Sequence, residues 1–356
     1  MTLLITNDDV EAVLEMGRCI DALEIAFRAY ATGGAVNRPR SHTYTDRGDG
    51  KHYLFKSMDG SVAELGVHAI RLSSDLTHEF VRDGRRIREK IPAAPGRRWV
   101  GLVLLFDIDE LVPLAIIQDG YLQRMRVGAT SALAARFLAR PASRVVGLVG
   151  TGWQAGAQLL GLHERGTLEQ YRVYGPDRQR CRAFCDEFTQ RLGQEVRPVT
   201  SGREAVQGAD IVALATNSHD PVIAGDWLTP GQHVGSVQGH ELDWGSLERA
   251  DLIGVRSHEE ATFHYAPGHA PVEAAERKHL PDHVKAKTVA LGDIVAGRTG
   301  RTDESQVTLF TGGGTGASSG LGIQFAAVAN AVYEAVRKAG RGREIPTEWF
   351  TEHYKP

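Results

Sequence analysis

The chain has little cysteine, no apolar run near the roughly 20 residues of a membrane span, and no large excess of either charge. Its three cysteines cannot all pair with one another. Cys181 and Cys185 have no histidine or cysteine cluster beside them, so we predict structural thiols and no metal site. Residues 1–9 turn polar too soon for a signal sequence. A net charge of −3 gives no electrostatic reason to expect nucleic acid or a membrane as partner. These absences favour a cytoplasmic protein.

The strongest positive signal is a strand, a glycine turn and a helix start within residues 144–158. Residues 145–149 are an apolar run typical of a strand buried on both faces. Gly150 and Gly152 allow the backbone to turn close to a pyrophosphate, which the N-terminus of the next helix would also attract. Ala155 occupies the third small-residue position of this motif. The stretch therefore predicts a dinucleotide-binding turn.

Strand and helix patterns alternate after this turn, which predicts a doubly wound parallel sheet. Further strands are expected at residues 171–174, 209–216, 233–237 and 252–255. Ligands of such sheets bind at the carboxyl ends of the strands. The predicted dinucleotide contacts are Gly150, Thr151, Gly152, Trp153, Gln154 and Ala155 in the first turn, Asp177 and Arg178 after the second strand, and Thr216, Asn217 and Val237 at later strand ends.

The end of the second strand decides between NAD and NADP. An acidic residue there binds the ribose 2′-hydroxyl of NAD, whereas its absence together with nearby arginine suits the 2′-phosphate of NADP. Gly175 stands where the acid would be, with Arg178 and Arg180 just beyond it. Asp177 comes two residues late but is within reach of the ribose through the Pro176 turn. The pattern favours NADP and leaves NAD open.

The flanking regions predict a second, mixed unit. Helical spacing predicts one helix over residues 8–32, and residues 100–107 with 111–118 read as a strand hairpin. Residues 77–98 are crowded with charge and are interpreted as a solvated loop or flap near the pocket, where Arg85, Arg86 and Arg88 would favour an acidic or large polar substrate. Residues 312–316 are predicted to form a flexible turn before a last helix at 323–336.

These residues together resemble the ornithine cyclodeaminase/mu-crystallin family over about residues 40–340. The resemblance is carried by residues 126–132 (Arg-Val-Gly-Ala-Thr-Ser-Ala), the turn at 150–155 (Gly-Thr-Gly-Trp-Gln-Ala) and residues 291–297 (Leu-Gly-Asp-Ile-Val-Ala-Gly). It implies a homodimer with a Rossmann-type NAD(P)-binding domain, placed here at 131–317. Residues 1–130 with 318–356 would then form an α+β substrate-binding and dimerisation domain. Family members reduce imines, oxidise amino acids, or cyclise ornithine with loss of ammonia.

The resemblance also assigns substrate residues. Arg126 matches the family's carboxylate-binding arginine, and Arg40 matches an upstream one, although Arg38 competes for that position. A guanidinium group suits a carboxylate because it binds both oxygens at once. An amino or imino acid is therefore the expected substrate.

The catalytic lysine of the family is replaced here. His68 occupies its position in Gly66-Val67-His68, and it serves either as an acid–base group or as an ordinary strand histidine. Lys56 and Arg71 are the alternatives that would restore a cation at this site.

Two further departures concern acidic residues. Residues 235–241 lack the aspartate that cyclodeaminase chemistry uses, and Phe325 stands where an acid is common in the family. We therefore expect an NAD(P)-dependent imine reductase or amino-acid dehydrogenase before a cyclodeaminase, with a non-catalytic NADP-binding protein as the third possibility.

Overall fold

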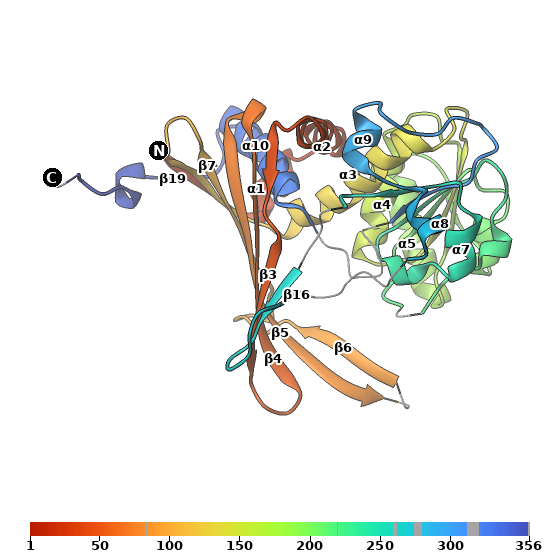
Figure 1. Ribbon diagram of the computed structural model, residues 1–356, viewed down its shortest axis with the longest axis horizontal. Helices are drawn as coiled ribbons and strands as arrows, with labels where there is room; N and C mark the ends of the chain where they lie inside the picture. Colours follow the sequence, from red (N-terminus) through yellow and green to blue (C-terminus); the bar gives the residue numbers. More distant parts are fainter. Residues whose placement is uncertain (83–84, 219, 259–261, 274–279, 312–319, 355–356) are drawn as a thin grey trace.

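The computed structural model describes residues 1–82, 85–218, 220–258, 262–273, 280–311 and 320–354. Within these residues the chain forms two β-sheets that stand side by side, with helix α3 (Gly120–Leu138) between them (Figure 1). One sheet is parallel and carries the glycine turn, and the other is mixed. No helix in this described part is long and apolar enough to cross a membrane.

The parallel sheet confirms the predicted doubly wound architecture. Its order is β11-β10-β9-β12-β13-β18-β14-β17, and every pair is parallel. Its strands are β9 (Val145–Val149), β10 (Gln170–Tyr174), β11 (Val196–Pro198), β12 (Ile211–Leu214), β13 (His233–Ser236), β14 (Leu252–Val255), β17 (Thr288–Ala290) and β18 (Thr308–Thr311). Its helices are α4 (Trp153–His163), α5 (Arg178–Leu192), α6 (Gly202–Val206), α7 (Trp244–Arg249), α8 (Asp282–Lys285) and α9 (Leu291–Val295). Since β10 and β12 flank β9, the strand order reverses at the carboxyl end of β9, where such sheets bind ligands.

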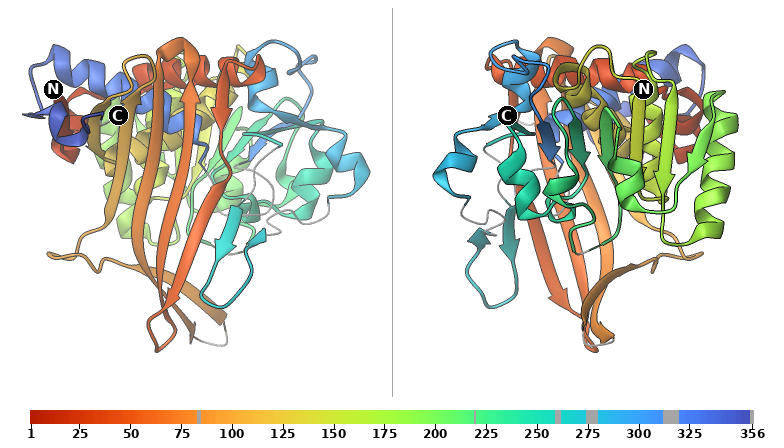
Figure 2. Two further views of the ribbon diagram at one scale, coloured as in Figure 1. Left: turned by 60° about the vertical axis from the view of Figure 1, so that its left-hand side comes forward. Right: turned by 90° about the vertical axis from the view of Figure 1, so that its right-hand side faces the viewer.

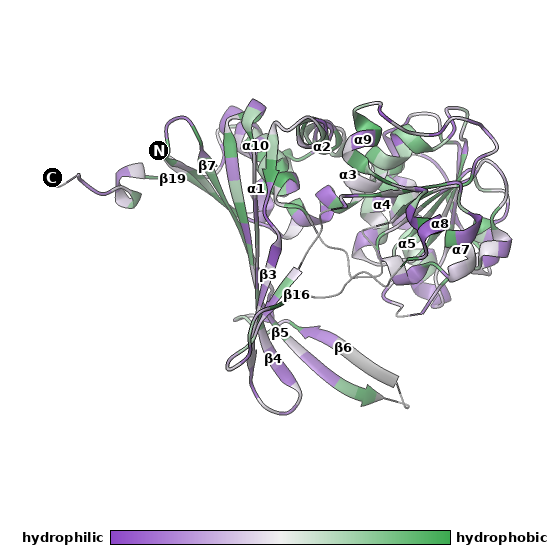
Figure 3. Cartoon of the chain, viewed as in Figure 1, coloured by the Kyte–Doolittle hydropathy of each residue, from purple (hydrophilic) through white to green (hydrophobic). Residues whose placement is uncertain are grey.

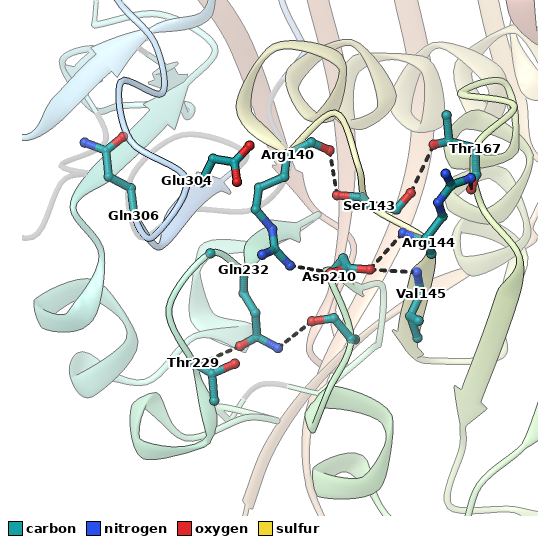
Figure 4. A network of polar contacts seen from close by, with 12 residues as sticks. Arg140, Ser143, Arg144, Val145, Thr167, Asp210, Thr229, Gln232, Glu304 and Gln306 are labelled. Atoms are coloured by element: carbon teal, nitrogen blue, oxygen red, sulfur yellow. Dashed lines mark hydrogen bonds and ion pairs between the residues drawn. The ribbon is translucent and has the colours of Figure 1, made fainter.

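Asp210 joins the amino-terminal ends of β9 and β12, away from the glycine turn (Figure 4). Its carboxylate accepts hydrogen bonds from the backbone amides of Arg144 and Val145, at 2.8 and 3.0 Å, and pairs with Arg140. Burial raises the pKa of Asp210, but these hydrogen bonds outweigh burial and hold the pKa below its usual value. The two central strands are thereby fixed in register at the end away from the glycine turn.

The mixed sheet runs β16-β15-β3-β4-β5-β7-β8-β1-β19, with β2 paired to β4 and β6 to β5. Its strands are β1 (Thr2–Ile5), β2 (Ala35–Asn37), β3 (Arg40–Asp46), β4 (Lys51–Val62), β5 (Val67–Arg82), β6 (Arg85–Ile91), β7 (Val100–Asp107), β8 (Pro113–Gln118), β15 (Thr262–Tyr265), β16 (Val272–Glu273) and β19 (Arg343–Ile345). One face of the upper part of this sheet is covered by three helices: α1 (Asn7–Val13), α2 (Met16–Ala31) and α10 (Gly322–Lys338). Figure 2 (left) shows the sheet from its other face, in front of these helices.

Two expectations about local structure were incomplete or wrong. The single helix expected over residues 8–32 is broken at Leu14, whose extended backbone (ψ 98°) ends α1 before α2 begins. The predicted loop at 77–98 is wrong for residues 77–82 and 85–91, which continue β5 and form β6, because the pairing of these two strands satisfies their backbone groups. The side chains of Arg85, Arg86 and Arg88, and residues 312–319, lie outside the described residues.

The parallel half also contributes to the mixed sheet. Strands β15 and β16 come from residues expected in the nucleotide-binding domain, yet β15 pairs in parallel with β3. The sequence patterns did not predict that the chain returns to the mixed sheet here, since two short strands in a polar stretch carry no periodic signal. The domain limits at 131 and 317 therefore remain a prediction.

Helix α3 packs closely between the parallel sheet and the mixed sheet. A Cβ atom on Gly128 would lie 2.3 Å from the carbonyl oxygen of Ala157, so a glycine is needed where α3 crosses α4. The helix is buried along nearly its whole length, with Arg124 and Arg126 among the buried residues. These two arginines are two residues apart, about 200° around the helix axis, and thus reach different parts of the molecule.

Candidate functional site

The glycine turn borders a cavity of about 620 Å³. Gly150 has a φ of 124°, and a Cβ atom there would lie 2.2 Å from the carbonyl oxygen of Ala215, so glycine is required by the backbone. A Cβ atom on Gly152 would meet nothing within 4 Å, so this glycine leaves room for a ligand. A dinucleotide therefore fits here, with its pyrophosphate against the turn and the start of α4.

The cavity collects most of the predicted dinucleotide contacts. Its lining includes Gly150, Thr151, Gly152, Trp153, Gln154, Asp177, Thr216 and Asn217. Ala155 is buried inside α4, and Val237 lines a small separate cavity beside Arg126. Arg178 is not part of the lining, whereas Arg180 is. The assignment of these residues to a cofactor stays a prediction, and the structure brings all but three of them to one cavity.

The structure explains why no acid ends the second strand. A Cβ atom on Gly175 would come within 2.8 Å of the Thr151 side chain, so a larger residue here requires that side chain to move. Asp177 is the N-cap of α5 and accepts a hydrogen bond from the backbone amide of Arg180 at 3.0 Å. Asp177 lines the cavity although it comes two residues after the usual position.

Arg124 supports the turn from α3. Its guanidinium lies 3.8 Å from the centroid of the Trp153 ring, and its Nε donates to the Trp153 carbonyl oxygen at 3.1 Å. The sequence contained no signal for this contact, because Arg124 and Trp153 are 29 residues apart.

A buried carboxylate organises the neighbouring strand ends. Glu241 accepts hydrogen bonds from the backbone amide and hydroxyl of Thr216, at 2.6 and 2.8 Å, and from the hydroxyl of Ser236 and the amide of Gln238. It therefore joins the carboxyl ends of β12 and β13 and shapes one wall of the cavity. A ring nitrogen of the preceding residue, His240, contacts the carbonyl oxygen of Ser218.

Arg126 is the central cation on the other side of α3. It is only 2% exposed, and its guanidinium carbon lies 4.9 Å from the centroid of the Phe325 ring. One guanidinium nitrogen donates to the neutral Gln324 side chain at 3.3 Å, and Nε has no hydrogen-bond partner among the described residues. A buried guanidinium held only by neutral groups is a receptor for an anion.

The surroundings of Arg126 are strongly positive. Burial, followed by the charges of Arg256, Arg71 and Arg40, lowers the pKa of Arg126 well below its usual value, and Asp119 acts in the opposite direction. A bound carboxylate would relieve this repulsion. Arg256 follows β14 directly in the sequence, yet only the fold places it beside Arg126 in a small cavity.

Lys56 belongs to a chain of polar contacts on β4, β5 and β6. Its Nζ and the Nζ of Lys90 each lie 3.0 Å from the same oxygen of Asp75. Ser73 donates to that oxygen at 3.3 Å and accepts from Arg71 at 3.2 Å. Burial, and then the charge of Lys90, lower the pKa of Lys56 to about 8, although Asp75 opposes them. Lys56 therefore exchanges a proton close to neutral pH.

Arg71 connects this group to Arg126. Its Nε lies 2.6 Å from Asp119, and its guanidinium carbon is 5.8 Å from the centroid of the Phe325 ring that Arg126 also covers. Arg40 shares the same face of the sheet, since His42, two residues along β3, stands opposite Lys56. Three of the predicted substrate residues are thus brought to one face, next to Lys56.

His68 lies elsewhere. It is three residues before Arg71 on β5, so the alternation of the strand directs it to the opposite face of the sheet. There it is 38% exposed, and its Nε2 lies 3.6 Å from Asp59, which also pairs with Arg38. Within one copy of the chain the structure does not bring His68 to Lys56 or Arg126. No group of three or more metal-binding side chains gathers in the described part of the chain.

Comparison with known proteins identifies the family of the chain. The model of the ornithine cyclodeaminase/mu-crystallin family matches residues 1–340. The chain belongs to this family. An alanine dehydrogenase of Archaeoglobus fulgidus is 26% identical over 354 residues, covering 97% of this chain and 98% of that protein.

Solved structures of family members have the same fold. The Delta(1)-pyrroline-2-carboxylate reductase of Thermococcus litoralis, in complex with NADH and L-proline, matches with a TM-score of 0.77 at 26% identity and covers 97% of this chain and 100% of that one. An archaeal alanine dehydrogenase dimer with bound NAD matches with a TM-score of 0.74 at 24% identity, covering 97% and 99%.

Proposed function

We propose that this protein is an NAD(P)-dependent oxidoreductase that acts on the C–N bond of an amino or imino acid, as an imine reductase or amino-acid dehydrogenase. The observation that carries the proposal is the double role of α3. Its Arg124 supports the glycine turn, and its Arg126, buried among neutral partners, faces the substrate side. One buried helix thus sets the distance between a dinucleotide and a carboxylate.

The cofactor, when bound, supplies hydride chemistry at its nicotinamide ring. Arg126 binds the substrate carboxylate through two parallel hydrogen bonds, and Arg71 and Arg40 add to the positive potential around it. This fixes the orientation of the α-carbon, which is the main contribution that the protein makes to such a transfer.

Lys56 provides the proton for the substrate nitrogen in imine reduction and accepts it in amine oxidation. Its pKa of about 8 suits both directions near neutral pH. It also shares a face of the sheet with Arg71, whereas His68 lies on the other face. We therefore assign the acid–base role to Lys56 in preference to His68.

NAD is proposed as the preferred cofactor. The expectation of NADP depended on Gly175, Arg178 and Arg180. Contact with Thr151 accounts for Gly175, and of the two arginines only Arg180 lines the cavity. The Asp177 carboxylate does line it, where it would bind a ribose 2′-hydroxyl and repel a 2′-phosphate.

A second copy of the chain is proposed to cover the open face of the mixed sheet. Hydrophobic residues concentrate in the upper part of this sheet, and its lower end is mostly hydrophilic (Figure 3). Several apolar side chains on the face away from the helices are exposed or half-buried: Tyr53, Ile70, Leu72, Val100, Leu102, Leu104 and Phe106. A contiguous apolar sheet face of this kind marks an interface, and a homodimer would bury the same face of both copies.

Light scattering of the purified protein tests this assembly. Two copies are expected, and Leu102→Glu is expected to give single chains, since it places a charge in the apolar face. Trp244→Glu, at a more exposed apolar position on α7, is the control that should leave the dimer intact. A wild-type protein that runs as one copy would refute the homodimer.

The cytoplasm is proposed as the location, because Cys19, Cys181 and Cys185 are all free thiols. Thiols that remain unpaired are typical of a reducing compartment.

The activity is tested by following NADH and NADPH absorbance with 2-oxo acids, each with and without ammonia or methylamine. Cofactor oxidation that requires both the carbonyl compound and the amine is expected, with NADH the better donor. Ammonia release from ornithine without net cofactor turnover would favour a cyclodeaminase instead. Nicotinamide binding without any turnover would favour a binding protein.

A further inference from the structure

The substrate side carries positive charge at two separate places. The first is Arg126, which has only neutral partners among the described residues. The second is the Lys56–Asp75–Lys90 cluster at the base of the β5–β6 hairpin. The pair formed by Arg71 and Asp119, in which one charge cancels the other, lies between them.

The lysine cluster holds an excess cation. Lys56 and Lys90 both bind one oxygen of Asp75, at 3.0 Å each, so two ammonium groups share a single carboxylate. The remaining partner of that oxygen, Ser73, is neutral. An ammonium group has three donors, and one carboxylate oxygen leaves most of them available. The cluster is therefore suited to bind a further anion.

Lys90 is the accessible member of this cluster. It is 49% exposed at its side chain, whereas Lys56 is 15% and Asp75 4% exposed. Lys90 stands on β6, beyond Lys56 as seen from Arg126, because the contacts run from Arg126 over Phe325 to Arg71, Ser73 and Asp75. A ligand that spans this row meets Arg126 first, Lys56 in the middle and Lys90 last.

We propose that the substrate is a 2-amino or 2-imino dicarboxylic acid, whose α-carboxylate binds Arg126 and whose distal carboxylate binds Lys90. The inference rests on the proposed function and deepens it. The nitrogen of such a substrate lies between its two carboxylates, as Lys56 lies between the two positive sites. Lys90 is then a residue that determines specificity, provided by a hairpin outside the helix-covered core of the sheet.

The test compares substrates of equal shape and different charge. Glutamate against glutamine, and aspartate against asparagine, are measured as NAD-dependent oxidations, with alanine as a substrate without a distal group. The wild-type enzyme is expected to prefer each acid over its amide by about tenfold or more in kcat/KM, as one additional charged contact provides. Rates are taken over a range of pH, so that a change in the protonation of Lys56 is separated from a change in substrate preference.

Three variants locate the effect. Lys90→Gln is expected to remove most of the preference for the acids over the amides. Because this substitution also raises the pKa of Lys56, acids and amides are compared for each variant at the pH of its highest rate. Lys90→Arg should retain it, because the charge remains. Lys51→Gln is the matched control: it removes a lysine from the same sheet, on the face opposite Lys56, and should change nothing.

The outcomes separate this inference from the proposed function. Oxidation of alanine or the amides without preference for the acids overturns the inference and leaves the proposed function in place. An equal loss for acids and amides in Lys90→Gln also overturns it. If no amino acid is oxidised and no 2-oxo acid is reductively aminated, the proposed function fails, and the inference fails with it.

Discussion

The two sides of α3 build their binding surfaces in different ways. On the side of the parallel sheet, the surface is formed by short runs of neighbouring residues at the ends of β9, β10 and β12. On the side of the mixed sheet it is formed by side chains from β4, β5, β6, α3 and α10, and its hydrogen-bonded pair Arg126 and Gln324 is separated by 198 residues in the sequence. The first kind of surface tolerates no change of backbone, and the second depends on charge. Each prediction below tests that difference.

The largest effect is expected from Arg126→Leu. The substitution removes a buried, bidentate partner of the carboxylate, so kcat/KM should fall by about 100-fold to 1000-fold, equivalent to roughly 3–4 kcal/mol. The affinity for NADH, measured by fluorescence, should change little. Arg136→Leu removes an exposed arginine of the same helix and is the control. An equal loss of NADH affinity would show that the two sides are not separable.

Gly150→Ala and Gly152→Ala compare two glycines of one turn. Alanine at Gly150 meets the Ala215 carbonyl and requires a left-handed backbone, so the protein should lose about 1–3 kcal/mol of stability in denaturant unfolding. Alanine at Gly152 meets no protein atom, so stability should hold while NADH binds more weakly. A loss of stability at Gly152 would mean that this glycine serves the fold.

Two substitutions beside Lys56 should move the pH profile of kcat/KM in opposite directions. The rate of imine reduction depends on protonated Lys56 and should fall above a pKa of about 8. Lys90→Gln removes a positive charge, raises the pKa of Lys56 and shifts this fall to higher pH. Asp75→Asn removes the negative charge and shifts it to lower pH.

Arg71 and His42 lie on the same face of the sheet as Lys56, so both residues are left unmutated in these measurements. Thermal melting of each variant provides the control for folding. An unmoved profile in both variants would exclude Lys56 as the acid–base group.

The smallest effect is expected from Asp177→Asn. The carboxylate lies at the rim of the cavity and partly serves as the cap of α5, so the ratio of NADH to NADPH affinity should fall only several-fold, about 1 kcal/mol. Arg178→Gln, outside the cavity lining, should leave the ratio unchanged. A wild-type preference for NADPH would refute the role of Asp177.

The sequence by itself determined the parallel half. A buried strand, two glycines and a helix start are local signals, because backbone geometry and burial act on neighbouring residues. This half could therefore be predicted down to the residues of one cavity. Through the family resemblance, the sequence also indicated Arg126, Arg71 and Lys56 as candidate substrate-binding and acid–base residues.

Only the tertiary structure decided which candidates meet. The alternation of β5 separates His68 from Arg71, and it depends on the register of β5 with β4 and β7. Lys90 belongs to the stretch interpreted as a loop, and Asp75, Arg124 and Glu241 carried no signal of their role. Such contacts join residues distant in the chain, so packing and strand pairing set them, and a local pattern does not encode them.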